Sequence, residues 1–148
     1  MLVLGRYYFY FFLLCIVFTM IFGVIAALLP LGVGIVFTAF PYLFAMIVVL
    51  FYFLKKNKRA PTPLERNKIA LGFIIIFFLY NALYAVFGPV FFSMGEPEVW
   101  ANWFKQMSNP QFLFAVFIPL LIYMIPLYLV TFWFYGKQAH RMSNKMFN

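Results

Sequence analysis

The segment that decides the fold reads IALGFIIIFFLYNALYAVFGPVFF at residues 69–92 and contains no Asp, Glu, Lys, Arg or His. An α-helix rises 1.5 Å per residue, so about 20 such residues cross a hydrocarbon core about 30 Å thick. Three further segments share this length and character: 7–29, 32–54 and 112–135. Each is apolar on all faces rather than at alternate positions, which favours helices over the strands of a β-barrel. We therefore predict an all-α integral membrane four-helix bundle, with residues 1–148 forming a single transmembrane domain.

The composition supports this class of protein. Of the 148 residues, 67% are hydrophobic and only 9% are charged, whereas a soluble domain averages about 25% charged residues. Too few charges are present to cover a globule with a polar surface, which excludes a soluble enzyme. The single cysteine, Cys15, lies inside the first apolar segment and predicts neither a disulfide nor a metal site. That segment also exceeds the roughly 7–15 residues of a signal-peptide core, so we expect a retained anchor.

The charge distribution predicts an orientation in the membrane. The formal net charge is +8, and six of the eleven basic residues fall in the loop 55–68, with Glu65 as its one acidic residue: Lys55, Lys56, Lys58, Arg59, Arg66 and Lys68. The loop 93–111 instead carries Glu96 and Glu98 against Lys105. Because basic loops stay in the cytoplasm, we expect both termini and the loop 55–68 inside, and the loop 93–111 outside. Basic residues placed beside apolar spans indicate contact with membrane lipids and argue against nucleic-acid binding.

The basic loop contains a sequence pattern that is typical of the start of a helix. Thr62 can cap a helix, Pro63 suits the first helical position, and Glu65 can return a hydrogen bond, as in a capping box. We predict that the third membrane helix begins near Pro63 in the cytoplasm. Arg66 and Lys68 are then expected to lie at the lipid headgroups, as part of the basic anchor formed by this loop.

A second helix signal lies in the loop 93–111. Pro97 and Glu98 suit a first turn, and four apolar residues follow at offsets of zero, three, four and seven, which places them on one face: Trp100, Trp103, Phe104 and Met107. Tryptophan prefers the membrane–water interface. We predict a short helix on the outer leaflet that acts either as an interfacial anchor or as a docking surface for a partner protein.

No set of catalytic residues can be assembled from this sequence. Proton-coupled transport and haem ligation generally need carboxylates or histidines at membrane depth, and the four segments contain none. The single histidine, His140, lies beside Arg141 in the basic tail, where a solvated side chain is expected. We therefore expect no enzymatic activity, no cofactor and no metal.

The remaining polarity inside the membrane centres on Asn81. This amide lies near the middle of the third segment, with Tyr80 and Tyr84 beside it. An amide in hydrocarbon seeks a partner, and interhelical hydrogen bonds contribute about 0.6 kcal/mol on average. We predict that these three residues form an intramembrane polar contact, which either clamps helices together or meets a ligand or another protein.

Three prolines interrupt the predicted spans. Pro41 falls in the middle of the second segment, and Pro119 and Pro126 fall seven apart in the fourth. A proline inside a helix removes a backbone hydrogen bond and favours a kink. We expect a kink at each, which serves packing or lines a pathway.

The basic run followed by Ala60-Pro61-Thr62-Pro63-Leu64-Glu65-Arg66 and then Ile69-Ala70-Leu71-Gly72 resembles a family of small, uncharacterised four-helix proteins of bacterial inner membranes. This resemblance implies a bacterial plasma membrane and no particular activity. The architecture is also similar to that of immunity proteins that protect bacteria from pore-forming bacteriocins, although no motif is shared.

Three functions are consistent with these observations. The first is an accessory or regulatory subunit of a membrane complex, which binds its partner, or a second copy of itself, within the bilayer. The second is an immunity-type protein that intercepts the inserted helices of a toxin. The third is a small transporter or channel for a neutral or lipid-like substrate, using the kinked helices and Asn81.

Overall fold

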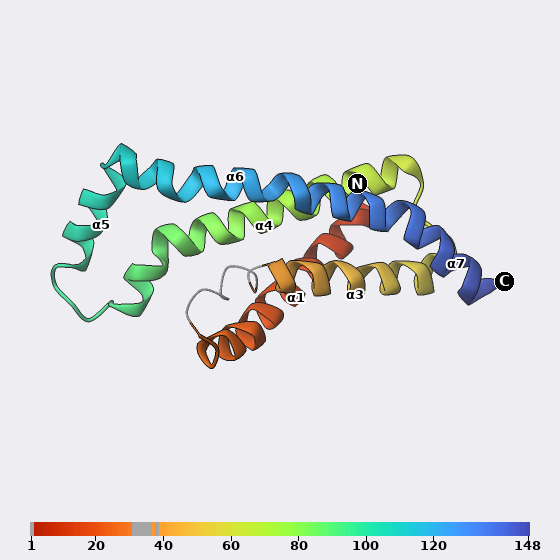
Figure 1. Cartoon of the computed structure of the whole chain (residues 1–148), viewed down its shortest axis with the longest axis horizontal. Helices are drawn as coiled ribbons and strands as arrows, with labels where there is room; N and C mark the ends of the chain where they lie inside the picture. The colour runs from red at the N-terminus through yellow and green to blue at the C-terminus, as the bar shows by residue number, and fades with distance from the viewer. Residues whose placement is uncertain (1, 31–36, 38) are drawn as a thin grey trace. The chain divides into compact units, whose positions relative to one another are not determined.

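The computed structural model describes residues 2–30, 37 and 39–148 of the chain, and this part is helical with short connections. Its elements are α1 (Leu2–Ala27), α3 (Ala39–Asn57), α4 (Pro63–Phe92), α5 (Val99–Met107), α6 (Pro110–Trp133), the π-helical turn η1 (Phe134–Gln138) and α7 (Ala139–Phe147) (Figure 1). Four stretches are long and apolar enough to cross a membrane: Val3–Ala27, Ala39–Asn57, Pro63–Phe92 and Pro110–Phe147. The predicted all-α membrane fold is confirmed. The first residues of the predicted span 32–54 lie outside the described residues.

The helices extend beyond the apolar segments that identify them. α1 already begins at Leu2, and the last helical stretch continues from α6 through η1 and α7 to Phe147. The connection between α3 and α4 is therefore confined to residues 58–62. Hydropathy reports where hydrocarbon contact ends, whereas the backbone hydrogen-bond ladder continues through polar residues until a cap or a breaker stops it.

The prolines differ in their positions within the helices. Pro41 lies near the start of the described part of α3, which begins at Ala39, and its predicted mid-span position stays a prediction because residues 31–36 and 38 lie outside the described residues. Pro119 and Pro126 lie inside α6 as predicted, and Pro89 lies inside α4 as well.

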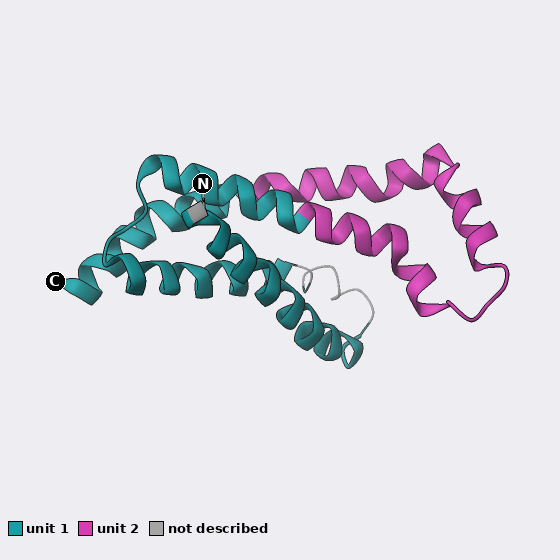
Figure 2. Ribbon diagram, turned by 180° about the vertical axis from the view of Figure 1, so that it is seen from behind, with its two compact units in different colours: residues 1–77, 128–148 teal, residues 78–127 magenta. Residues whose placement is uncertain are grey.

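The chain divides into two compact units (Figure 2). Unit 1 comprises Met1–Phe77 and Tyr128–Asn148, and unit 2 comprises Phe78–Leu127. Unit 1 therefore holds α1, α3, the first half of α4 and the end of the last helical stretch. Unit 2 holds the second half of α4, α5 and most of α6.

Aromatic packing forms the core of unit 1, where α1 and α3 run antiparallel against one another (Figure 1). Phe11 of α1 stacks on Phe73 of α4, with ring centroids 3.9 Å apart and planes 5° apart. Tyr42 of α3 meets Phe11 edge-on at 5.4 Å, and Tyr135 of η1 meets Phe73 edge-on at 5.7 Å. Because lipid tails are as apolar as these side chains, close packing rather than exclusion of water holds the helices together.

Two buried hydrogen bonds connect α3 to the last helical stretch. The Tyr42 hydroxyl and the Thr131 hydroxyl share a hydrogen bond of 2.5 Å, and both side chains are fully buried. The Tyr135 hydroxyl donates to the Met46 carbonyl oxygen at 2.7 Å. A hydroxyl in hydrocarbon is costly without a partner, so these bonds select one register of α3 against α6 and η1.

Candidate functional site

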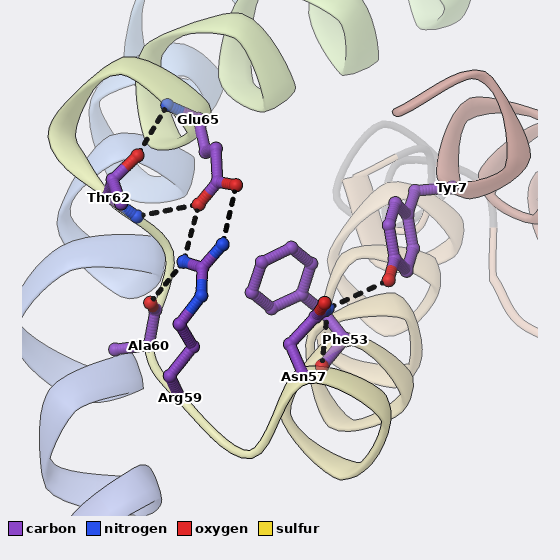
Figure 3. A network of polar contacts seen from close by, with 7 residues as sticks. All are labelled: Tyr7, Phe53, Asn57, Arg59, Ala60, Thr62 and Glu65. Carbon is purple, nitrogen blue, oxygen red and sulfur yellow. Dashed lines mark hydrogen bonds and ion pairs between the residues drawn. The ribbon is translucent and has the colours of Figure 1, made fainter. Parts of the chain in front are cut away.

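The basic loop begins at a defined helix end. Lys58 adopts a left-handed conformation with φ of 51°, and its N–H donates to the Leu54 carbonyl oxygen at 2.8 Å. This is the αL ending of a helix, a position at which glycine is usual. The preceding Asn57 donates from Nδ2 to the Tyr7 hydroxyl at 2.9 Å and to the Phe53 carbonyl at 3.0 Å, which ties the end of α3 to α1 (Figure 3).

The predicted capping box is present at the start of α4. The Thr62 N–H donates to Glu65 Oε2 at 2.9 Å, and the Glu65 N–H donates to Thr62 Oγ1 at 3.3 Å. Arg59 completes the arrangement, because its Nη1 and Nη2 donate to the two Glu65 carboxylate oxygens at 2.7 and 2.8 Å (Figure 3). Nη1 also donates to the Ala60 carbonyl at 3.1 Å. The hydrogen bonds to Glu65 raise the pKa of the Arg59 guanidinium above its usual value.

The side chains of the predicted basic anchor lie in four different environments. Lys55, Lys56, Lys58 and Lys68 are exposed. Arg59 is paired with Glu65, in the only ion pair among the described residues. Thr62 and Glu65 form the cap, and Arg66 turns toward the protein.

Arg66 packs against the end of the last membrane helix. Its guanidinium carbon lies 3.8 Å from the centroid of the Phe132 ring, which is cation–π geometry. Its side chain also covers Gly136, where a Cβ atom would collide with Nη1. The buried Nε has no hydrogen-bond partner among the described residues. We predicted a headgroup anchor for Arg66; the structure shows that its side chain packs against Phe132 and Gly136, and its position relative to the lipid headgroups stays a prediction.

A hydrogen bond beside Arg66 strengthens this contact, and sequence reasoning missed it. The Tyr128 hydroxyl donates to Asn67 Oδ1 at 2.9 Å, and the Tyr128 ring stacks near Phe132 with centroids 5.9 Å apart. The one signal available in the sequence was the spacing of Tyr128, Phe132 and Gly136, which are successive i, i+4 positions on one helix face.

In unit 2, α5 confirms the short helix predicted in the loop 93–111, but its apolar stripe is divided. The helix begins at Val99, so Pro97 and Glu98 precede it and do not form its first turn. Trp103 faces α4, with Nε1 donating to the Val86 carbonyl at 2.9 Å and the indole stacked 5.5 Å from the Phe87 ring. Met107 is also half-buried, whereas Trp100 and Phe104 are 53% and 61% exposed.

The predicted intramembrane polar residues also lie in α4 within unit 2. Asn81 and Tyr80 are half-buried and both have interaction partners. Tyr84 is 59% exposed. Two other polar side chains of the membrane helices, Tyr42 and Thr131, are hydrogen-bonded to each other. A contact of Asn81 with a ligand or with another protein stays a prediction.

Within the described part of the chain, no group of three His, Cys, Asp or Glu side chains could hold a metal ion. No protein-family model matches the chain, and no curated protein or solved structure matches it significantly.

Proposed function

We propose that this chain is a non-catalytic membrane protein that acts by protein–protein contact, as an accessory or regulatory subunit of a membrane complex. The observation that carries the proposal is the aromatic patch on α5, formed by the exposed side chains of Trp100 and Phe104. Both rings lie beside Trp103, with ring centroids 6.0 and 5.0 Å from its own. Trp103 is in turn bonded to the Val86 carbonyl.

Both the residue types of this patch and the way its helix is held favour protein binding. Tryptophan is enriched among the residues that dominate binding energies at protein interfaces. Ordering a flexible side chain on binding costs about 0.5–1.5 kcal/mol. Because Trp103 fixes this short helix to α4, we expect a smaller ordering cost when the patch binds a partner. A simple lipid anchor would not need such a fixed base.

We place the protein in the inner membrane of a bacterium, with both termini in the cytoplasm. The basic loop between α3 and α4 and the basic α7 support this orientation through the positive-inside rule. Single cysteines at Asn102 and Asn144, both exposed, test it by labelling with a membrane-impermeant maleimide on intact cells. We expect Asn102→Cys to react and Asn144→Cys to react only after lysis. The native Cys15 is buried and gives little background.

The binding function is tested by quantitative affinity purification from native membranes in mild detergent. The double variant Trp100→Ala/Phe104→Ala should lose most of the stoichiometric membrane partner, since it removes the exposed rings and leaves Trp103 in place. Asn102→Ala is the matched control, because Asn102 is exposed on the same short helix.

The outcomes separate the roles of α5. If the double variant retains its partner as fully as Asn102→Ala does, α5 is only an interfacial anchor. If the unmodified protein purifies without any stoichiometric partner from its native membrane, the accessory-subunit proposal is wrong. The immunity-type and transport functions then become the hypotheses to pursue.

A further inference from the structure

A shallow apolar groove runs between α1 and α4 in unit 1. Its volume is about 290 Å³, and its walls are Leu4 and Tyr8 from α1, with Lys68, Leu71, Gly72 and Ile75 from α4. Leu71 and Ile75 are 46% and 54% exposed on its open side. The groove belongs to helices that are long and apolar enough to span a membrane, so lipid tails rather than water surround its open side.

The floor of this groove is built by a close contact between Tyr8 and Gly72. The Tyr8 ring lies where a side chain at position 72 would be, since a Cβ atom there would collide with it. The Tyr8 hydroxyl donates to the Lys68 carbonyl oxygen at 2.8 Å, which uses a polar group that would otherwise face the groove. What the groove offers an occupant is thus an apolar surface.

One end of the groove carries an unpaired positive charge. Lys68 is exposed, and among the described residues the only ion pair joins Glu65 to Arg59, so the Lys68 ammonium has no carboxylate partner. Lys68 also lies near the N-terminal end of α4, which follows the basic loop. An apolar groove with a cation at one end is complementary to an acyl chain attached to an anionic headgroup.

We propose that this groove binds one anionic phospholipid, with an acyl chain against Leu71 and Ile75 and the headgroup phosphate at the Lys68 ammonium. The binding is separate from the partner contact proposed for α5, which lies in the other unit. It gives the basic end of α4 a second role beside orientation, namely the recruitment of a particular class of lipid.

Native mass spectrometry of the full-length protein tests this proposal. The protein is delipidated in a neutral detergent and titrated with phosphatidylglycerol or with phosphatidylcholine of the same acyl chains. We expect one phosphatidylglycerol to bind with clear preference over phosphatidylcholine. One lysine near a membrane surface contributes about 1 kcal/mol, so Lys68→Gln should weaken phosphatidylglycerol binding about fivefold. Lys55→Gln is the charge-matched control, because Lys55 is also exposed and lies in the last turn of α3, outside the groove, and it should have little effect.

A second pair of variants tests the acyl-chain part of the groove. Ile75→Trp fills the groove and should abolish retention of the lipid. Leu79→Trp is the control and should retain it, because Leu79 lies one turn further along α4, is also exposed and does not line the groove. Both native side chains are more than half exposed, and an unchanged thermal unfolding midpoint verifies the fold of each variant.

Three results would overturn the proposal. Equal losses in Lys68→Gln and Lys55→Gln would mean that diffuse charge attracts the lipid. Equal retention in Ile75→Trp and Leu79→Trp would place the lipid elsewhere. A dimer in the spectra that disappears only in Ile75→Trp would assign the groove to a second copy of the chain.

Discussion

The hydrogen bond between Tyr42 and Thr131 is the sharpest test of how this bundle is held together. It joins α3 to α6 between two side chains that are fully buried and 89 positions apart in the sequence. Tyr42→Phe removes one hydroxyl and leaves the ring contacts with Phe11 and Phe77 in place. Thr131→Val replaces the other hydroxyl with a methyl group of similar size. The double variant removes both, so the three proteins and the native chain form a double-mutant cycle.

Interhelical hydrogen bonds in membrane proteins contribute about 0.6 kcal/mol on average and reach about 1.7 kcal/mol. Both side chains of the Tyr42–Thr131 pair are fully buried, so we expect a coupling energy of about 1–1.7 kcal/mol, in the upper part of that range. Thr131 has a further interaction, which makes its single-variant cost larger than the coupling energy. The cycle cancels that extra cost, because it is lost both in the Thr131→Val single variant and in the double variant.

The assay is equilibrium unfolding in mixed micelles of a neutral detergent with increasing mole fraction of dodecyl sulfate, followed by circular dichroism. Tyr84→Phe is the control, since Tyr84 is 59% exposed, and its free energy of unfolding should change by less than about 0.5 kcal/mol. A coupling energy of zero, with each single variant as stable as the control, would refute the inference that buried hydroxyl pairs set the register of these helices.

Three further predictions use the same unfolding assay. Phe11→Ala should lower the free energy of unfolding by about 3–5 kcal/mol, because it empties the centre of the aromatic core. Phe9→Ala, at a ring that is 59% exposed, should lower it by less than about 1 kcal/mol, and equal losses would contradict the assigned core. Lys58→Gly should stabilise the protein by up to about 1 kcal/mol because it relieves a left-handed conformation, whereas Lys56→Gly, inside the last turn of α3, should destabilise it; a loss of stability in Lys58→Gly would argue against the αL cap. Glu65→Gln should lower the free energy of unfolding by no more than about 1 kcal/mol in low salt, and by less in 1 M salt, because salt screens the pair with Arg59. A loss of stability that does not depend on salt would show that the helix cap, and not the ion pair, causes it.

Local signals in the sequence were reliable where one short stretch contained all the interacting groups. The capping box of Thr62 and Glu65 could be predicted because both partners lie within one turn of helix. The short helix in the loop 93–111 was predicted from the spacing of Trp100, Trp103 and Phe104. What the spacing could not distinguish was which ring faces the protein: Trp103 faces α4, while the other two stay exposed.

Arg66 shows the same limit for a charged residue, because the sequence does not reveal which part of the protein its side chain contacts. Its position beside an apolar span is typical of a headgroup anchor, and Lys68, two residues later, is exposed as such an anchor should be. The contact of Arg66 with Phe132 depends on a residue more than sixty positions away. No local pattern reports a partner at that separation.

The sequence by itself determined that this chain is a helical membrane protein, since uninterrupted apolar segments of sufficient length have no other stable arrangement in lipid. It also determined where the charges gather and where α4 begins. Only the tertiary structure decided which faces of the helices meet, as in the stack of Phe11 on Phe73 and the bond between Tyr42 and Thr131. The physical reason is that helices apolar on every face have no polar side to mark the surface. In hydrocarbon, both lipid and protein accept the same side chains, so the choice between them rests on shape and on a few hydroxyl groups.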